Sequence, residues 1–280
     1  MLNPSSIINC NGQLLDLSAP IIMGILNVTP DSFYDGGRYA VSDSILAQAR
    51  KMLEEGATII DIGGMSSRPG AEIISVEEEL KRVLPAIDLV VQHFPNALIS
   101  IDTIRAEVAR KSVERGASII NDISAGSIDN TMFATVAELG VPYILMHIKG
   151  KPKDMQLRPS YDNVVLEVTD FMIEKVGQLR ELGVKDIILD VGFGFGKTIE
   201  HNYQLLKYMD QFKILDLPVL AGVSRKSMIY KVLNNTAKEA LNGTTALNLV
   251  ALQRGAKILR VHDVKAAVEV VKLWEQLEIV

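Results

Sequence analysis

A glycine that closes an amphipathic segment, and is followed within three residues by a short apolar run, recurs five times in this 280-residue chain. The glycines are Gly56, Gly116, Gly140, Gly183 and Gly255. Glycine adopts left-handed backbone angles without a Cβ clash, so each of them predicts the end of a helix. The runs that follow are short, β-branched and apolar, which is typical of parallel strands buried on both faces. Repeated units of this kind indicate an α/β fold.

Three further apolar runs, starting at positions 21, 98 and 219, raise the number of predicted strands to eight, with the others starting near 59, 119, 143, 186 and 258. Helical patterns fill the intervals at 42–55, 76–94, 106–115, 131–139, 163–182, 200–212, 238–254 and 265–277. Eight βα units in a chain of this length predict a (β/α)8 TIM barrel. A doubly wound open sheet is the alternative, but such sheets usually have roughly five to seven strands.

No shift in composition marks a linker, so we expect residues 1–280 to form a single domain with a short N-terminal extension. The connections after the first and second strands, at 29–38 and 63–71, are long, polar and rich in glycine and proline. Such loops over a barrel mouth are candidates for lids that close on a substrate. A merely solvated connection is the alternative.

Polar side chains close every predicted strand, at the end where barrels of this kind carry their active sites. They are Asn27, Asp61, Asp102, Asn121, His147, Asp190, the neighbours Ser224, Arg225 and Lys226, and finally Arg260 and His262. Any one of them has an ordinary structural explanation, as a satisfied polar group or a helix N-cap. Because all eight strands end this way, we predict that the side chains converge on one site.

The residue types indicate a ligand that is both anionic and heterocyclic. Cationic and donor groups suit phosphate oxygens, and the candidates are Arg68, Arg225, Lys226, Arg260 and His262. Acceptors and an amide match the edge of a flat nitrogen heterocycle, and the candidates are Asp102, Asn121 and Asp190. A buried carboxylate could also stabilise positive charge that develops on such a ring.

The segment from Asp190 to Thr198 is similar to nucleotide-binding loops but fails both of their patterns. GxxxxGK[ST] would need glycine at 191, where valine stands, and GxGxxG would need glycine at 197, where lysine stands. We therefore interpret this segment as a flexible turn that brings Phe195 against a ligand.

Composition narrows the class of partner and the compartment. The net charge is −5, from 29 basic and 34 acidic residues, which argues against a nucleic-acid partner. Cys10 is the only cysteine, so neither an intramolecular disulfide nor a Cys-based zinc site is possible. The first residues lack the pattern of a secretory signal, and no apolar run reaches the ~18 residues that span a bilayer. We expect a cytoplasmic protein with small-molecule partners and no membrane partner.

Blocks of sequence between about residues 21 and 265 resemble the dihydropteroate synthase family. The most specific blocks are GILNVTPDSF at 24–33 and RVHDV at 260–264. Between them lie DIGG (61–64), SRPG (67–70), SIDT (100–103), IND (120–122), MH (146–147), GFGFGK (192–197), SRKS (224–227) and GTTA (243–246). The resemblance covers nearly the whole predicted barrel.

The resemblance implies a transferase of folate biosynthesis. In its reaction p-aminobenzoate displaces diphosphate from 7,8-dihydropterin-6-ylmethyl diphosphate and gives 7,8-dihydropteroate, with diphosphate leaving before the arylamine attacks. It also implies Mg²⁺ bound to the diphosphate, inhibition by sulfonamides and a homodimer.

The resemblance also assigns roles by motif. The pterin would be held by Asp102, Asn121, Asp190 and Lys226. The diphosphate would be held by Asn27, which would also ligate Mg²⁺, together with Ser67, Arg68, Arg260 and His262. The p-aminobenzoate pocket would be framed by Phe33, Pro69, Phe195 and Ser227. Asp102, Lys226 and Arg260 would carry the catalysis.

The chain departs from the family at four positions. Met65 stands where glutamate is common, Lys149 where glutamine is, Val191 where proline is, and Ser67 in place of a frequent threonine. Ser67 keeps the hydroxyl, so its diphosphate contact should survive. Two alternatives remain: a pterin-binding domain that passes a methyl group from methyltetrahydrofolate to a corrinoid protein, and a non-catalytic pterin-binding protein. The first would have no need of the Arg260–His262 grip, and the second would be expected to have lost the phosphate ligands.

Overall fold

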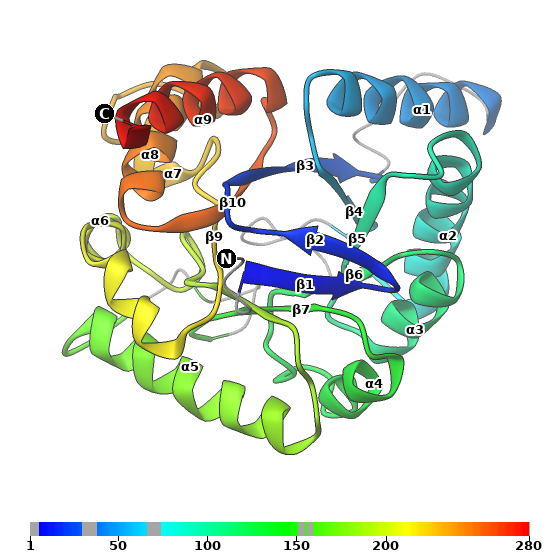
Figure 1. Cartoon of the computed structure of the whole chain (residues 1–280), viewed down its shortest axis with the longest axis horizontal. Coiled ribbons are helices and arrows are strands. Elements are labelled where there is room, and N and C mark those ends of the chain that lie inside the picture. The colour runs from blue at the N-terminus through cyan, green and yellow to red at the C-terminus, as the bar shows by residue number, and fades with distance from the viewer. Residues whose placement is uncertain (1–5, 30–37, 66–73, 151–154, 156–158, 280) are drawn as a thin grey trace.

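The computed structural model describes residues 6–29, 38–65, 74–150, 155 and 159–279. Eight parallel strands close into a barrel that a ring of helices surrounds (Figure 1). In barrel order the strands are β3 (Ile21–Asn27), β4 (Ile59–Gly63), β5 (Leu98–Asp102), β6 (Ile119–Asp122), β7 (Tyr143–Met146), β8 (Ile187–Asp190), β9 (Val219–Ala221) and β10 (Ala256–Val261), which pairs again with β3. The predicted (β/α)8 TIM barrel is confirmed.

Helices follow the strands in the predicted intervals. They are α1 (Arg38–Glu54), α2 (Val76–His93), α3 (Ala106–Glu114), α4 (Met132–Leu139), α5 (Val164–Glu181), α6 (Ile199–Lys207), α7 (Ser227–Tyr230), α8 (Leu241–Gln253) and α9 (Val264–Ile279). The helix expected at 200–212 ends earlier, at Lys207, and the chain continues as a 3₁₀ helix over Met209–Leu215. The short helix α7 was not predicted, since four residues are too few to show a helical period.

The recurring glycines do what their position predicted. Gly56, Gly116, Gly140, Gly183 and Gly255 all have positive φ, between 65° and 109°. Each reverses the chain after a helix so that the following segment can enter the barrel as a strand. The glycines that recur in the sequence therefore mark the ends of helices in the structure.

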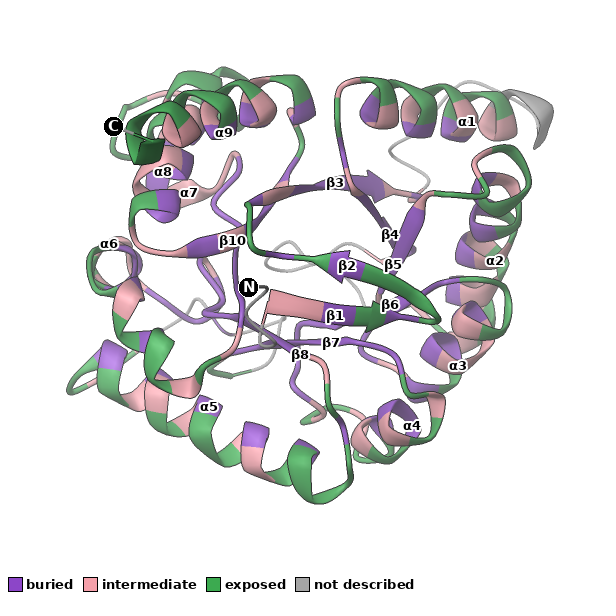
Figure 2. Ribbon diagram, viewed as in Figure 1, coloured by how far each residue is buried: buried purple, intermediate pink, exposed green. Residues whose placement is uncertain are grey.

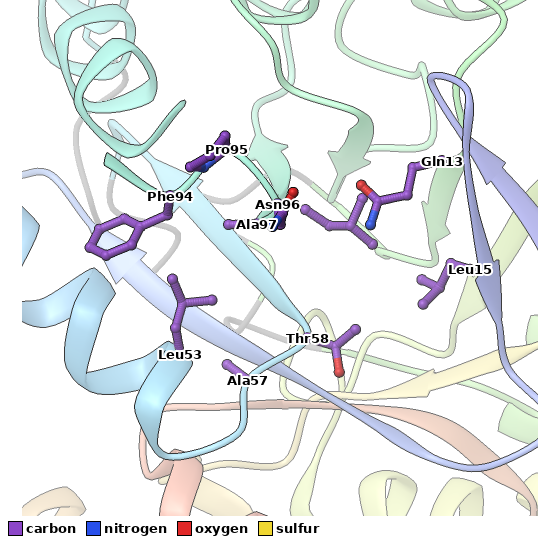
Figure 3. A pocket seen from close by; sticks show the side chains of 10 residues that line it. Gln13, Leu15, Leu53, Ala57, Thr58, Phe94, Pro95, Asn96 and Ala97 are labelled. Atoms are coloured by element: carbon purple, nitrogen blue, oxygen red, sulfur yellow. The ribbon is translucent and has the colours of Figure 1, made fainter. Parts of the chain in front are cut away.

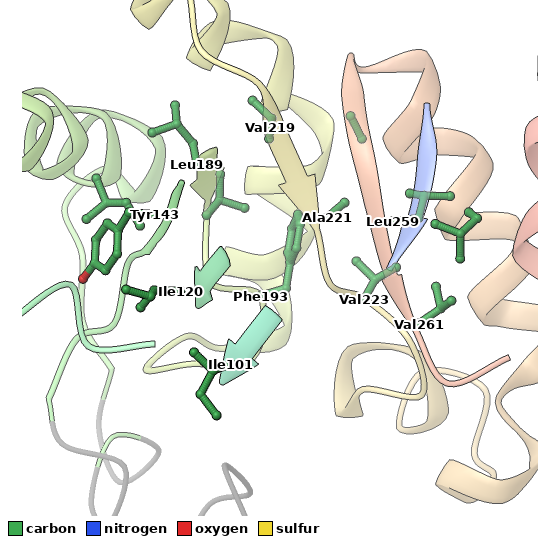
Figure 4. Close-up of a cluster of buried hydrophobic side chains, with 14 of the residues drawn as sticks. Ile101, Ile120, Tyr143, Leu189, Phe193, Val219, Ala221, Val223, Leu259 and Val261 are labelled. Carbon is green, nitrogen blue, oxygen red and sulfur yellow. The ribbon is translucent and has the colours of Figure 1, made fainter. Parts of the chain in front are cut away.

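The main hydrophobic core fills the space between the strands and the helices. Figure 2 shows buried residues along the strands and on the helix faces turned toward them. Figure 4 shows part of this layer, in which Tyr143, Leu189 and Val219 lie near one another around the barrel wall. A second cluster consists of the side chains near the N-terminal ends of the strands, among them Met23, Ile59, Leu98, Ile119, Ile144, Ile188, Leu220 and Ile258.

The expected N-terminal extension is an antiparallel hairpin, which the sequence reading missed. Its strands are β1 (Ile7–Cys10) and β2 (Gln13–Asp16), joined by Asn11 and Gly12, both with positive φ. In Figure 1 the hairpin lies across the end of the barrel. Three of its side chains, Ile8, Cys10 and Leu15, join the second cluster, as does Leu17 directly after it. The hairpin therefore closes the N-terminal end of the barrel, and the strands' carboxyl ends stay available for the site.

A hollow of about 460 Å³ lies at this same N-terminal end, between the hairpin and the chain segments that enter β4 and β5 (Figure 3). Its lining includes Leu15, Leu53, Phe94 and Leu98, and none of its lining residues is charged. A hollow without charged groups does not suit an anionic ligand. We therefore place the site at the opposite end of the barrel.

Candidate active site

The carboxyl ends of the strands carry most of the predicted site residues. Those within the described ranges are Asn27 at the end of β3, Asp102 at the end of β5, Asn121 on β6, Asp190 at the end of β8, Phe195 in the loop after β8, Lys226 and Ser227 at the start of α7, Arg260 on β10, and His262 just after it. Phe33, Ser67, Arg68 and Pro69 lie outside the described residues, as do parts of the two long loops.

Arg260 joins two carboxylates across the barrel. Its Nε donates to Asp61 Oδ2 and its Nη2 donates to Asp102 Oδ2, both at 2.6 Å. Asn121 Nδ2 donates to the same Asp61 oxygen at 3.1 Å. Four strands, β10, β4, β5 and β6, thus contribute to one hydrogen-bonded network, which crosses β3 between β10 and β4. The guanidinium side chain is only 14% exposed, so these are strong, poorly screened ion pairs.

The network leaves Asp102 close to its titration point at neutral pH. Burial raises its pKa to about 7, Arg260 opposes this rise, and the nearby Asp61 carboxylate adds to it. Burial disfavours the charged form of Arg260, but Asp61 and Asp102 raise its pKa above the ordinary value. An ionisable carboxylate held next to a permanent cation is typical of functional sites.

Lys226 and Asp190 form a second charged group beside the first. The Lys226 Nζ and the Asp190 Oδ2 both lie beside Gly222, at 3.7 and 3.8 Å from where a Cβ there would stand. Burial lowers the pKa of Lys226 to about 8, and Asp190 opposes that change. Burial raises the pKa of Asp190, which Lys226 opposes. A Cβ at 222 would stand in ordinary van der Waals contact with both atoms, so residue 222 lies directly against this pair.

The loop after β8 is held by many hydrogen bonds rather than being a flexible turn, which corrects our expectation. Gly192 N donates to Asp190 Oδ1 at 2.7 Å, and Gly194 N donates to Asn202 Oδ1 at 2.6 Å. Phe193 O accepts from Lys226 Nζ at 2.5 Å. The glycines in this segment predicted a flexible backbone. In the structure they have positive φ angles, which bring the peptide groups of the loop to these partners.

Phe195 borders an apolar patch at the mouth, as its predicted role requires. It is 7% exposed and packs with Ile104, Ile123, Met146 and Met155. The Lys226 Nζ lies 4.9 Å from the centroid of its ring, within the range of a cation–π contact. Aromatic and apolar surface thus lies directly beside the charged groups.

His262 and Ser224 meet between the ends of β9 and β10. The Ser224 Oγ and the His262 Nδ1 are 3.0 Å apart, and His262 N donates to the same hydroxyl at 3.2 Å. Burial, with Arg260 nearby, lowers the pKa of His262 to about 4. The imidazole is therefore neutral at pH 7, and it would meet an anion as a hydrogen-bond donor rather than as a cation.

Two strand-end residues that the sequence analysis expected to converge on the site are engaged by partners within the protein. Arg225 forms a two-pronged ion pair with Asp263, with both N–O distances at 2.8 Å, and donates to the carbonyl oxygens of Ala237 and Lys238. His147 is 5% exposed and packs edge-on against the Phe171 ring. Both side chains find partners within the protein, since their strand ends lie against loops that supply acceptors and rings.

Asp61 is the residue that sequence reasoning undervalued. The sequence marks it as a strand end, but its residue type and position assign it no role of its own. In the structure it is 1% exposed, and it bonds both Arg260 and Asn121. Its other oxygen, Oδ1, has no hydrogen-bond partner within the described residues. The sequence feature that could have revealed Asp61 is its position at a strand end. That feature alone does not distinguish a site residue from a structural polar residue.

The departures from the family pattern occupy different surroundings. Val191 is fully buried in the main core, and Met65 packs at the edge of the Phe195 patch. Lys149 pairs with Glu167 at 2.9 Å and lies 4.1 Å from the Tyr161 ring centroid. All three side chains are accommodated by packing or pairing in this chain.

Comparison with known proteins places the chain in a family. Residues 23–262 match the family described as "Pterin binding enzyme". The dihydropteroate synthase of Haemophilus influenzae is 47% identical over 267 residues, which are 95% of this chain and 96% of that protein. This chain belongs to the dihydropteroate synthase family. The resemblance found in the sequence is thereby confirmed, and the chain is a transferase of this kind.

Solved dihydropteroate synthases share the fold across their whole length. The Yersinia pestis enzyme in a sulfonamide drug complex has a TM-score of 0.92 and 42% identity, covering 98% of this chain and 100% of that one. The Xanthomonas albilineans dihydropteroate synthase with 4-aminobenzoic acid has a TM-score of 0.92 and 41% identity, covering 99% of each chain. Within the described ranges of this family member, every helix is too short or too polar to span a bilayer.

Proposed function

We propose that the chain joins p-aminobenzoate to 7,8-dihydropterin-6-ylmethyl diphosphate, forming 7,8-dihydropteroate and diphosphate, and that residues 1–280 form the one domain that does so. The observation that carries the proposal is the network in which Arg260 joins Asp61 and Asp102 beside Asn121. It offers carboxylates, an amide and a cation at one barrel mouth. That is the donor and acceptor set that a pterin with an anionic leaving group requires.

The pterin site consists of Asp102, Asn121, Asp190 and Lys226. The two carboxylates accept hydrogen bonds from the ring's N–H groups, and the amide and the ammonium donate to its acceptors. Because Asp190 and Lys226 lie together beside Gly222, they would hydrogen-bond to the same edge of a flat ring. Asp102 and Asn121 come from adjacent strands that pair in register, so they address another edge.

The diphosphate site consists of Asn27, Ser67, Arg68, Arg260 and His262. Asn27 fits a Mg²⁺ ion, since its Oδ1 is an oxygen ligand that lies beside Gly63 together with Asp102 Oδ2, each 3.7 Å from where a Cβ would stand. Magnesium takes oxygen ligands and commonly combines few protein ligands with substrate phosphates and water. Bound there, Mg²⁺ would neutralise charge on the leaving diphosphate. Within the described residues, no three His, Cys, Asp or Glu side chains are grouped to hold a metal alone.

The p-aminobenzoate site consists of Phe33, Pro69, Phe195 and Ser227. Phe195 offers a ring face in an apolar patch, and the start of α7 adjoins it through Lys226. An aromatic acid would place its ring on this patch. Sulfonamides would occupy the same site, which is supported by the family member solved as a sulfonamide drug complex.

The reaction is dissociative, with the C–O bond to diphosphate breaking before the new C–N bond forms. Arg260 and His262 hold the diphosphate as negative charge grows on its leaving oxygen. The Asp102 carboxylate, when ionised, stabilises the positive charge left on the pterin and its methylene group. The amine of p-aminobenzoate, held against Phe195, then attacks that carbon and loses a proton. No side chain needs to act as a nucleophile.

A homodimer in the cytoplasm completes the proposal. The outer surface of α9 exposes Leu273 and Leu277, which are 69% and 63% exposed. They are four residues apart and so lie on one helix face. Exposed apolar side chains gathered on one face are typical of subunit contacts. The single, buried Cys10 suits a reducing compartment.

The direct test is turnover of 7,8-dihydropterin-6-ylmethyl diphosphate with p-aminobenzoate, with and without Mg²⁺. We expect dihydropteroate and diphosphate in equal amounts, at a higher rate with Mg²⁺. The variant Asp102→Asn should fold, with lower stability because Arg260 loses a carboxylate partner, and retain under about 1% of the activity, because an amide cannot stabilise the pterin cation. Absence of product from the wild-type chain would refute the function, and a fully active Asp102→Asn would refute the role of the carboxylate.

A further inference from the structure

Lys197 is a buried amine that the reaction described above does not use. It is only 3% exposed, and it follows the loop that connects β8 to α6. Its Nζ lies 2.9 Å from His147 Nδ1, 2.9 Å from Gly192 O and 3.0 Å from Phe195 O, with His147 O a little farther at 3.3 Å. An ammonium group has three N–H donors, and the three nearest atoms can accept all of them.

The partners of this amine are all uncharged. Burial, with Lys197 nearby, lowers the pKa of His147 to about 2, so the imidazole next to the amine is neutral. Burial lowers the pKa of Lys197 itself well below its ordinary value, although Asp190 opposes this. Burying an amine is expensive, and none of the atoms that this amine bonds carries a negative charge that would offset the cost. Stability alone therefore does not account for a lysine here.

The backbone that Lys197 binds needs an external constraint. Gly192, Gly194 and Gly196 have φ angles of 71°, 83° and 61°, and glycine is free to leave that region for many others. A Cβ at Gly192 would overlap the His147 carbonyl oxygen, so no larger residue could stiffen the loop at that position. Lys197 supplies the constraint instead, by bonding the carbonyl oxygens at both ends of the segment from Gly192 to Phe195.

The same segment carries three contacts of the proposed substrate site. Gly192 N bonds Asp190 at 2.7 Å, and Phe193 O bonds Lys226 at 2.5 Å. The Phe195 ring lies 4.9 Å from the Lys226 Nζ. If the segment turned, Asp190, Lys226 and Phe195 would all lose a partner at once. The loop is therefore the common support of the pterin group and the p-aminobenzoate group.

We propose that Lys197 is a positioning residue for both substrates, which locks the 192–195 backbone so that Asp190, Lys226 and Phe195 face the mouth together. The proposal rests on the proposed function, because those three residues are its pterin and p-aminobenzoate ligands. Tyr161 and Asn202 also bond this loop, but they do so at Gly196 O and Gly194 N. Lys197 bonds the two carbonyl oxygens that border the pterin and p-aminobenzoate contacts.

The experiment compares Lys197→Met, which has a similar volume and no donor, with Lys197→Arg, which keeps a charged donor. Lys207→Met is the matched control, since Lys207 is an exposed lysine at the end of α6, the helix that follows this loop. The measurements are kcat, KM for each substrate, pterin binding by calorimetry, and unfolding by urea. We expect Lys197→Met to raise the KM for p-aminobenzoate and the Kd for the pterin by about tenfold or more, since small misplacements of substrate contacts cost that much.

The pattern of results separates positioning from a merely structural role. Positioning predicts that KM and Kd rise in Lys197→Met under conditions where urea unfolding shows the variant fully folded, although the acceptors left without a donor lower its stability. It also predicts that Lys197→Arg recovers part of the binding and that Lys207→Met changes nothing. Wild-type KM and Kd in Lys197→Met, or a loss of stability with unchanged KM and Kd, would overturn the inference. If Lys197→Met does not fold, the KM for p-aminobenzoate and the Kd for the pterin are measured in Lys197→Gln instead, because glutamine keeps a donor but has a shorter side chain. Wild-type values of both constants in that variant would overturn the inference. A wild-type chain without turnover would instead refute the function itself.

Discussion

At the scale of single residues, the charges at the barrel mouth are set by their neighbours more than by their own chemistry. Burial raises the pKa of Asp102 to about 7 and lowers the pKa of Lys226 to about 8, and the opposite charges beside each group oppose these changes without cancelling them. An ordinary carboxylate and an ordinary lysine would be fully charged throughout this range. The site is therefore sensitive to pH in the range where the enzyme works.

The first prediction concerns this pH dependence. The value of kcat/KM for the pterin diphosphate should rise with pH as Asp102 loses its proton near pH 7, because the carboxylate is the active form. It should fall again as Lys226 loses its proton near pH 8, because the ammonium is the active form. A steady-state pH profile should thus be bell-shaped with its maximum between these values. A flat profile from pH 5 to pH 9 would contradict it.

The second prediction concerns Asp61. In Asp61→Asn the Arg260 side chain loses one of its two carboxylate partners, and breaking a buried pair costs about 3 kcal/mol or more. We expect lower stability in urea unfolding and a kcat/KM reduced about a hundredfold, because Arg260 is no longer held in place. The control is Asp88→Asn, whose pair with Arg115 at 2.6 Å is half exposed and contributes about 1 kcal/mol or less. Equal behaviour of the two variants would show that Asp61 does not position Arg260.

At the scale of elements, the two ends of the barrel have separate tasks. The β1–β2 hairpin covers the N-terminal end and joins the cluster inside it, whereas the polar network lies at the carboxyl ends. In barrels of this type the first end serves stability and the second serves chemistry. Substitutions in the hairpin should therefore change stability without changing the kinetic constants.

The third prediction uses two neighbouring leucines of β2. Leu15 is 8% exposed and packs into the second cluster, at the N-terminal end of the barrel, whereas Leu14 is 70% exposed. Leu15→Ala should lower the free energy of unfolding by about 2 to 5 kcal/mol, and Leu14→Ala by less than about 0.5 kcal/mol. Urea titrations give both values, and turnover at 25 °C should stay normal in both variants. Equal costs would mean that the hairpin does not close the barrel.

At the scale of the whole molecule, the exposed apolar side chains of α9 have no packing partner in a single barrel. Its exposed leucines, Leu273 and Leu277, lie at the end of the chain and away from the barrel interior. Burying such side chains between two copies would gain about 1.5 to 3 kcal/mol for each one. The homodimer proposed above would use this face.

The fourth prediction is that the protein sediments at twice its chain mass of 30.7 kDa, and that Leu273→Glu makes it monomeric. A charge placed in an apolar contact is costly to desolvate, so the dimer should dissociate at micromolar concentrations. The control is Leu166→Glu, at an exposed position of α5 (56% exposed) away from α9. Analytical ultracentrifugation measures both masses. A wild-type monomer, or a Leu273→Glu variant that is still a dimer, would exclude the α9 face as the dimer interface.

Local signals in the sequence determined the barrel, the ends of its helices and the type of ligand. The glycines after the helices, the β-branched runs and the polar strand ends each depend on a few adjacent residues, so a linear reading finds them. The Asn11–Gly12 pair is the same kind of signal for a hairpin and could have revealed β1 and β2. Their docking against the barrel involves residues far along the chain, and no local pattern records it.

Only the tertiary structure decided which polar strand ends form the site. Arg225 and Arg260 look alike in the sequence, yet Arg225 pairs with Asp263 and Arg260 with Asp61 and Asp102 across the barrel. His147 and Lys197 are 50 residues apart, and they meet because adjacent strands bring their loops together. The charge and the role of a buried group depend on which partners surround it, and those partners come from distant parts of the chain. The residues are a property of the sequence, but their protonation and pairing are a property of the fold.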